Sequence, residues 1–159
     1  MARQSHARGH PPGTTTILLT RPEPGASATA ATLRRQLGEA AILLSPLMAV
    51  EFLSPDLPKR AFSAVIFTSR AGVASAVRLR EAGMTLPQRA YAVGDGTAAA
   101  ALVAGFQTQS AQGDARALVA LVRSDSPMGP LLHLRGREAG GALAKGLQSA
   151  GTETFEAVT

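Results

Sequence analysis

Short runs of aliphatic residues recur along this chain, and each is followed by a polar or glycine-rich turn and an alanine-rich stretch with helical spacing. Short apolar runs that alternate with helical stretches are typical of a parallel sheet covered on both faces by helices. The predicted strands are residues 16–20 (TILLT), 41–44 (AILL), 64–68 (AVIFT), 90–93 (AYAV), 131–134 (LLHL) and 154–158 (TFEAV). A further, more polar strand is expected near residues 106–109, at a sheet edge.

Glycines mark where the predicted helices end. In each case a Gly follows the last apolar residues of the helical pattern, and a new apolar run begins soon after. A Gly just beyond a helix supplies the left-handed backbone conformation that closes it. The predicted stops are Gly38, Gly83, Gly105 and Gly151, and Asp114 is expected to cap a further helix through Val122. This succession predicts an α/β fold with right-handed crossovers.

A proline-rich stretch, residues 45–58, breaks the repeat. It surrounds the apolar run 48–53, and no helical pattern separates that run from the strand at 41–44. We therefore expect a crossover between two domains. The strand–helix–strand piece 14–47 is too small to bury a core of its own, since a parallel unit of this kind needs neighbouring strands. Residues 1–13 are expected to form a flexible N-terminal tail, because they contain Gly9, Pro11, Pro12 and Gly13, and they lack the apolar stretch of a signal peptide.

The composition narrows the function classes. The 159 residues amount to about one domain and contain no Cys. The absence of Cys excludes a disulfide scaffold, a thiolate zinc site, an iron–sulfur cluster and a cysteine nucleophile. No apolar run approaches the ~18 residues of a transmembrane helix, so no membrane association is expected.

The basic charge favours a small acidic partner. The net charge is +5, but the Arg residues are scattered and aromatic residues make up only 4% of the chain. The interleaved basic and aromatic residues of a single-strand binder are therefore missing, and nucleic acid is not the expected partner. The charge suits an acidic small molecule.

Candidate binding residues lie directly after the predicted strands. In a parallel sheet, ligands bind beyond the carboxyl ends of the strands. The exits here offer hydroxyls, guanidinium groups and backbone N–H groups at helix starts, all of which bind anions. Each residue alone also has an ordinary structural role, because Ser and Thr cap helices and Gly forms turns. The exits are residues 20–25 (TRPEPG), 68–72 (TSRAG), 94–97 (GDGT) and 135–137 (RGR).

The usual catalytic constellations are missing from the sequence. His133, the one His outside the N-terminal tail, lies within a predicted strand and is expected to be a buried core residue rather than a base. Glu23 and Asp95 are the carboxylates at strand exits, and both fit plain turn positions. No Asp, Glu and His cluster has metal-ligand spacing, and the phosphate-loop pattern is absent, so no metal site is predicted.

One pattern leaves a nucleotide-binding alternative open. Residues 94–99 (GDGTAA) follow a strand and open a helix, which matches the loose dinucleotide fingerprint G-x-G-x-x-A. The acidic residue expected about 20 residues further on would be Asp114, which also has the context of a helix cap. A nicotinamide- or flavin-dependent oxidoreductase is therefore one alternative. A non-catalytic anion-binding module of flavodoxin-like fold is another.

Longer segments around the strand exits form an ordered set. They are LLTRPEPGASATAATLRRQLG (residues 18–38), AVIFTSRAGVASAV (64–77), AYAVGDGTAAAALVAGF (90–106) and LLHLRGREAGGALAKGLQSAGTETFEAV (131–158). From about residue 17 to residue 159 the chain resembles the uroporphyrinogen-III synthase family, with its T-R-P, F-T-S, A-V-G-x-x-T-A and L-x-x-R-G segments. It differs at Arg70 and Ala71, where many members have an Asn.

The resemblance implies a bilobal α/β protein, in which two flavodoxin-like lobes are joined by two crossing segments and the active site is the cleft between them. On this basis residues 14–47 are the N-terminal part of lobe one, 48–53 the outgoing crossover, 54–156 lobe two and 157–159 the start of the return crossover. The C-terminal part of lobe one is then expected to be missing from this chain. An incomplete first lobe and an inactive fragment are the corresponding expectations.

The resemblance also implies a reaction. Members dehydrate and close hydroxymethylbilane, a linear tetrapyrrole with eight carboxylates, to uroporphyrinogen III with inversion of the last ring. A cytoplasmic, monomeric lyase of haem biosynthesis without metal or redox cofactor is implied. By match to the family's loops, Thr97 is the catalytic candidate, and Thr20, Arg21, Ser69, Gly94, Arg135 and Gly136 are candidates for substrate binding. A helix cap is the alternative role for Thr97, and a structural role in the first turn is the alternative for Arg21.

Overall fold

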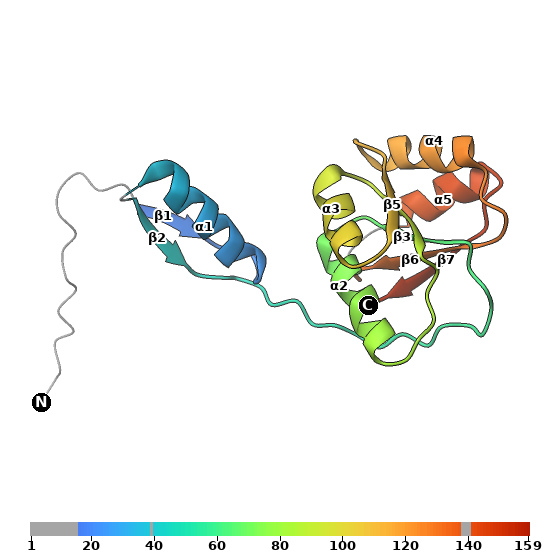
Figure 1. Cartoon of the computed structure of the whole chain (residues 1–159), viewed down its shortest axis with the longest axis horizontal. Helices are drawn as coiled ribbons and strands as arrows, with labels where there is room; N and C mark the ends of the chain where they lie inside the picture. Colours follow the sequence, from blue (N-terminus) through green and yellow to red (C-terminus); the bar gives the residue numbers. More distant parts are fainter. Residues whose placement is uncertain (1–15, 39, 138–140) are drawn as a thin grey trace, which may run out of the picture. The chain divides into compact units, whose positions relative to one another are not determined.

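A computed structural model of the chain describes residues 16–38, 40–137 and 141–159 (Figure 1). The chain divides into two compact units, the first ending at Glu51 and the second comprising Phe52–Thr159. The tail predicted for residues 1–13 lies outside the described residues.

The first unit is one strand–helix–strand element. It consists of β1 (Thr16–Leu19), α1 (Gly25–Leu37) and β2 (Ala41–Leu44). The two strands pair in parallel and form a two-stranded sheet. Helix α1 buries only small side chains, those of Ala26 and Ala30. The predicted strands and the helix between them are therefore present, with little apolar surface removed from water.

The second unit contains a five-stranded parallel sheet. Its strands are β3 (Ala64–Phe67), β4 (Arg89–Ala92), β5 (Gln107–Ser110), β6 (Leu131–Arg135) and β7 (Thr154–Val158), in the spatial order β5-β4-β3-β6-β7. Its helices are α2 (Arg70–Glu81), α3 (Asp95–Val103), α4 (Ala115–Asp125) and α5 (Ala142–Ser149). The predicted α/β class is confirmed, and the polar strand β5 lies at a sheet edge as expected.

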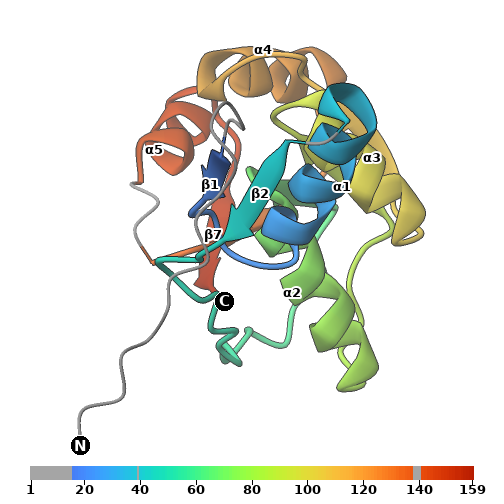
Figure 2. The same ribbon diagram turned by 90° about the vertical axis from the view of Figure 1, so that its left-hand side faces the viewer.

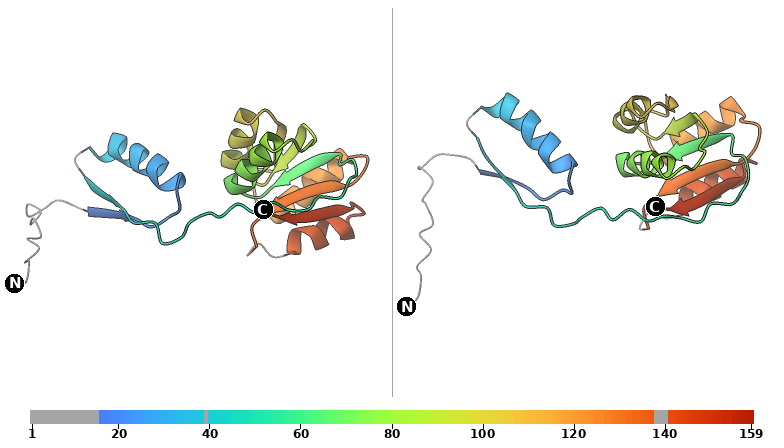
Figure 3. Two further views of the ribbon diagram at one scale, coloured as in Figure 1. Left: turned by 90° about the horizontal axis from the view of Figure 1, so that it is seen from below. Right: turned by 60° about the horizontal axis from the view of Figure 1, so that its bottom comes forward.

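Helices cover both faces of this sheet (Figure 1, Figure 3). Alternate residues of the central strands point to opposite faces, as the pleat of a strand requires. Val65 and Phe67 pack with residues of α2 and α3, whereas Ala64 and Ile66 pack with residues of α4 and α5. Figure 2 shows α4 and α5 side by side on their face. The core therefore consists of two layers, one on each side of the sheet.

The helix ends follow the predicted chemistry. Gly38, Gly83, Gly105 and Gly151 all have positive φ, at 64°, 86°, 81° and 80°. Asp114 is the N-cap of α4, where its carboxylate accepts hydrogen bonds from two backbone N–H groups. The helix runs past the predicted end at Val122 to Asp125. It stops there because Ser126 adopts the left-handed conformation, with φ 44°.

The described residues between β2 and β3 form neither helix nor strand, as the prolines predicted. From Phe52 onward, side-chain contacts hold this segment to the second unit. The Arg78 guanidinium lies 4.2 Å from the ring centroid of Phe52. Arg60 donates two hydrogen bonds to the Glu153 carboxylate, at 2.8 and 3.0 Å, just before β7 begins. These contacts place the lead-in to β3 on the surface of the second unit.

Candidate functional site

The carboxyl edge of the five-stranded sheet brings together the candidate residues of the second unit. Ser69 follows β3, Gly94 and Thr97 follow β4, and Arg135 and Gly136 stand at the end of β6. These strands are parallel neighbours, so their carboxyl ends meet at one edge. The chain also changes direction between β3 and β6. Such a topological switch point is where open α/β sheets bind ligands.

Several strand ends differ slightly from the prediction, and two of these differences lengthen the exit loops at the carboxyl edge. The strands were expected to include Thr68 and Val93, but β3 stops at Phe67 and β4 at Ala92. Past that point the chain bends toward the helix, although the Val93 N–H still donates to the Phe67 carbonyl at 3.1 Å. Thr68 therefore belongs to the exit loop, beside the candidate residues.

Ser69 caps helix α2, and it also lies at the exit of β3, where the sequence analysis expected it. Its side chain caps α2 by accepting a hydrogen bond from the Gly72 N–H at 3.2 Å, and the residue is exposed. A Cβ on Gly72 would lie 2.8 Å from the carbonyl oxygen of Leu134 in β6. The first turn of α2 can thus approach the switch point closely only because residue 72 is Gly. The cap leaves the Ser69 hydroxyl hydrogen available to a ligand.

The turn after β4 is open to solvent. Gly94 is the N-cap of α3, so the alternative that Thr97 caps this helix is wrong, because Thr97 stands inside its first turn. Among the described residues the Thr97 hydroxyl has no hydrogen-bond partner, and its N–H donates to the Gly94 carbonyl at 3.0 Å. Apart from chain neighbours and the backbone of α3, no heavy atom in the described part of the chain lies within 4 Å of the position that a Cβ would take at Gly94 or Gly96. The space beside this turn is available to a ligand.

Arg135 is folded back onto the edge rather than extended. Its Nη1 donates to the carbonyls of Gly136 and Arg137, at 3.1 and 3.3 Å. Its Nε lies 3.1 Å from a carboxylate oxygen of Glu156 in β7, and the side chain is only 17% exposed. Arg135 therefore supplies positive charge at this edge from a fixed position.

Thr20 and Arg21 follow β1 in the first unit. Arg21 donates to the Thr29 hydroxyl at 2.9 Å, and its guanidinium covers Gly25 so closely that a Cβ there would lie 2.8 Å from Nε. The Thr20 carbonyl accepts from the Leu47 N–H at 3.0 Å. These contacts support the structural role for Arg21 in the first turn of α1, while both side chains remain exposed.

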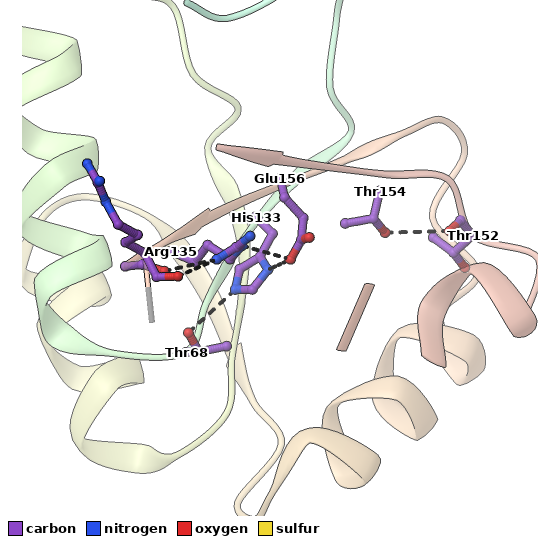
Figure 4. A network of polar contacts seen from close by, with 8 residues as sticks. Thr68, His133, Arg135, Thr152, Thr154 and Glu156 are labelled. Carbon is purple, nitrogen blue, oxygen red and sulfur yellow. Dashed lines mark hydrogen bonds and ion pairs between the residues drawn. The ribbon is translucent and has the colours of Figure 1, made fainter. Parts of the chain in front are cut away.

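His133 is buried, as predicted, but its polar partners were not anticipated. Its Nδ1 lies 3.2 Å from Oε1 of Glu156, and its Nε2 lies 3.4 Å from the hydroxyl oxygen of Thr68 (Figure 4). Burial lowers the pKa of His133, although the Glu156 carboxylate opposes this effect. The sequence held one signal for this cluster. Glu156 is a charged residue within the otherwise apolar run TFEAV.

Two further findings concern metal-ligand clusters and the dinucleotide fingerprint. Within residues 16–38, 40–137 and 141–159, no group of three or more His, Cys, Asp or Glu side chains could hold a metal ion. Asp114, the residue that would support the dinucleotide fingerprint, accepts from the N–H groups of Arg116 and Ala117 at 2.9 and 3.0 Å. Its carboxylate is thus engaged in capping α4. None of the helices in the described ranges is long and apolar enough to span a membrane.

The fold is that of a doubly wound α/β protein, and its polar carboxyl edge lies at the topological switch point, where proteins of this class bind ligands. The family model of uroporphyrinogen-III synthase HemD matches residues 27–159, so the chain belongs to that family. This is a family of lyase-type enzymes of tetrapyrrole biosynthesis, and the substrate class is a small-molecule tetrapyrrole. No curated protein matches the chain.

Proposed function

We propose that this chain is a cyclising hydro-lyase that converts hydroxymethylbilane to uroporphyrinogen III, with inversion of the last pyrrole ring, in haem biosynthesis. The observation that carries the proposal is the open carboxyl edge of the second unit. There, the starts of α2 and α3 present hydrogen-bond donors beside the fixed charge of Arg135. Family membership supplies the substrate class.

The reaction depends on positioning of the substrate more than on general acid–base catalysis. The substrate loses hydroxide, and the resulting azafulvene closes without help to the uninverted I isomer. The protein has to hold a polyanion in a shape that favours the other closure. Backbone N–H groups at helix starts and fixed guanidinium groups bind carboxylates without needing a proton transfer. The edge described above consists of such groups.

Three glycines at the edge support close approach of a ligand. Gly94, Gly96 and Gly136 have no positive φ, and beyond their chain neighbours and helix backbone a Cβ at any of them would meet no heavy atom of the described residues within 4 Å. Neither backbone conformation nor packing among the described residues calls for Gly at these positions. A ligand that lies against the backbone would require Gly here, because any side chain would separate the ligand from the N–H groups.

The roles of the candidate residues follow from these positions. Thr97 acts by its side chain near the reacting end, since its hydroxyl faces an open turn. Ser69, Gly94 and Gly136 bind substrate carboxylates by hydroxyl and N–H groups, and Arg135 contributes charge. Thr20 and Arg21 contribute substrate contacts from the first unit. The protein acts as a cytoplasmic monomer without metal or redox cofactor.

The test is the isomer ratio in a coupled assay. Hydroxymethylbilane is generated in place, the chain is added, and the oxidised uroporphyrins are separated. An excess of isomer III over the protein-free control is expected. Isomer I alone contradicts the proposal, and binding of uroporphyrinogen without turnover would then favour a non-catalytic anion-binding module. Affinity for a nicotinamide or flavin nucleotide would favour the oxidoreductase alternative.

Substitution at Gly96 separates ligand contact from folding. Gly96→Ala should raise stability by about 0.5–1 kcal/mol, because Ala is favoured over Gly in a helix. The same methyl group should slow formation of isomer III about tenfold or more by keeping substrate from the backbone. Opposite changes in stability and activity are the expected signature. An unchanged rate would exclude close approach of the substrate at this turn.

A further inference from the structure

A hydroxyl, an imidazole and a carboxylate form a chain of contacts at the switch point. The chain runs from Thr68 at the exit of β3, through His133 in β6, to Glu156 in β7, with contacts of 3.4 and 3.2 Å (Figure 4). The His133 side chain is 2% exposed, and that of Glu156 is 22% exposed. Thr68 is half-buried. The chain therefore connects a half-buried hydroxyl at the exit of β3, through a buried imidazole, to a carboxylate in β7.

The ionised Glu156 carboxylate determines which group donates in each of these hydrogen bonds. Arg135 forms an ion pair with the Oε1 atom of Glu156 that His133 contacts, so this carboxylate acts as an acceptor. Nδ1 of His133 must then carry the hydrogen. In the neutral ring the other nitrogen, Nε2, is an acceptor, and the Thr68 hydroxyl donates to it. The hydrogen of Thr68 thus points inward.

A hydroxyl whose hydrogen is held inward offers only its lone pairs to a ligand. This makes Thr68 different from the rest of the edge. The Ser69 hydroxyl and the N–H groups at the starts of α2 and α3 can donate to a carboxylate. Thr68 would repel a carboxylate and accept from an N–H group. Thr68 is therefore an acceptor beside these donors, next to the strand where the chain reverses direction.

We propose that Thr68 accepts a hydrogen bond from a pyrrole N–H of the substrate, and that His133 and Glu156 are positioning residues that hold the Thr68 hydrogen away from it. The inference rests on the proposed function for its substrate class. It specifies that a pyrrole ring, rather than a carboxylate side chain, lies at the switch point. When hydroxide leaves with its electron pair, positive charge spreads to the ring nitrogen. A hydroxyl oxygen that accepts a hydrogen bond from this N–H stabilises that cation.

The competing explanation is purely structural, since the same contacts tie the ends of β3, β6 and β7 together. The tautomer of His133 is the first readout that distinguishes the two. Nitrogen NMR of the imidazole at neutral pH should show a protonated Nδ1 and an unprotonated Nε2. Removal of the hydroxyl in Thr68→Val should shift the Nε2 signal. A ring protonated at Nε2 overturns the proposal, because Thr68 would then accept from His133 and its hydrogen would point outward.

Ligand binding is the second readout, and two probes separate ring contact from charge. Uroporphyrinogen III carries pyrrole N–H groups and carboxylates, whereas benzenehexacarboxylate carries carboxylates alone. Thr68→Val should weaken uroporphyrinogen binding about 3- to 10-fold, the equivalent of one lost hydrogen bond, and leave benzenehexacarboxylate binding unchanged. Thr68→Ser should keep both affinities, because it keeps the hydroxyl.

The matched control is Thr108→Val. Thr108 is also half-buried, but its hydroxyl contacts the Phe106 carbonyl at 3.4 Å within the edge strand region, away from the strand exits. It should change neither affinity. Equal weakening of both probes by Thr68→Val, a wild-type affinity of Thr68→Val for uroporphyrinogen, or no uroporphyrinogen binding by the wild type would each overturn the proposal.

The two proposals fail in different ways. A wild-type chain that yields only isomer I contradicts the proposed function, while the tautomer and the two probes still decide the role of Thr68. A wild-type chain that yields isomer III, together with a Thr68→Val variant that binds uroporphyrinogen normally, contradicts the role of Thr68 and leaves the proposed function in place.

Discussion

The two units use the same local element with different results. Both contain parallel strands joined through a helix, and the strand sequences AILL in β2 and LLHLR in β6 are similarly apolar. Leu43 of β2 is 56% exposed, whereas Leu132 of β6 is fully buried. The difference lies in the neighbours, because β6 has a strand on each side and helices on both faces, while β2 pairs with β1 alone. Apolar sequence makes a strand, and neighbouring elements make it stable.

The polar contacts of Glu23 in the first unit and of His133 in the second unit also differ, since the former join residues close in sequence and the latter join separate strands. In the first unit Glu23 is bound locally, to the N–H and hydroxyl of Ser27 at 3.0 and 2.8 Å, and these hydrogen bonds lower its pKa. In the second unit Thr68, His133 and Glu156 come from three strands. A polar cluster assembled across strands depends on the sheet, so it is found where the sheet is complete enough to hold it.

Proteolysis should show the largest difference between the units. Arg34 and Arg35 in α1 and Arg116 in α4 are all exposed sites for trypsin. Cleavage in α1 should be faster by about 100-fold or more, because a unit with few buried apolar side chains opens at little free-energy cost. Limited digestion followed by mass spectrometry measures the order of cuts. Equal resistance of the two helices would remove the contrast between the units.

A matched pair of leucines tests the same contrast by substitution. Leu132→Ala should lower the free energy of unfolding of the second unit by about 2–5 kcal/mol, since it leaves a cavity in a closed core. Leu43→Ala should cost less than about 1 kcal/mol, because that side chain is already exposed. Tyr91 is the one Tyr of the chain and is buried in the second unit, so its near-ultraviolet circular dichroism follows that unit. Similar losses in both variants would contradict the burial difference.

Two glycines in the first turns of neighbouring helices should respond in opposite directions. Gly72→Ala should destabilise the second unit by about 1–3 kcal/mol, because the new Cβ would lie 2.8 Å from the Leu134 carbonyl and α2 would have to move. Gly96→Ala meets nothing within 4 Å and serves as the control. Denaturant titrations of both variants measure the effect. A neutral Gly72→Ala would mean that α2 shifts freely at the switch point.

The smallest expected effect is on pH dependence. Burial lowers the pKa of His133 below its ordinary value of 6.5, so the unfolded chain takes up this proton more readily than the folded one. The second unit should therefore be most stable above that pH and lose stability as the pH falls through the unfolded value. His133→Gln should flatten this part of the profile. At still lower pH, protonation of Asp114 and Glu153 should destabilise the wild type and the His133→Gln variant alike, because hydrogen bonds lower the pKa values of these two carboxyl groups. An unchanged slope in His133→Gln would exclude His133 as its origin.

Much of the fold could be predicted because its signals are local. The apolar runs, the glycines at positive φ and the Asp114 cap each depend on a few consecutive residues, and they appear as expected. The end of α4 was predicted too early, because the left-handed conformation of Ser126 has no distinctive signal in its sequence. The exit segments followed from one topological rule, which places all carboxyl ends of a parallel sheet on one edge, whereas the choice of single residues within them came from the family resemblance.

The cluster at the switch point could not be predicted in this way. Thr68 and His133 are 65 residues apart, and His133 and Glu156 are 23 residues apart. The sequence by itself determined that His133 would be buried, that Thr68 would stand near a strand end, and that Glu156 would interrupt an apolar run. Only the tertiary structure decided that these residues meet, because the order and register of β3, β6 and β7 depend on pairing between strands rather than on any one strand's own residues.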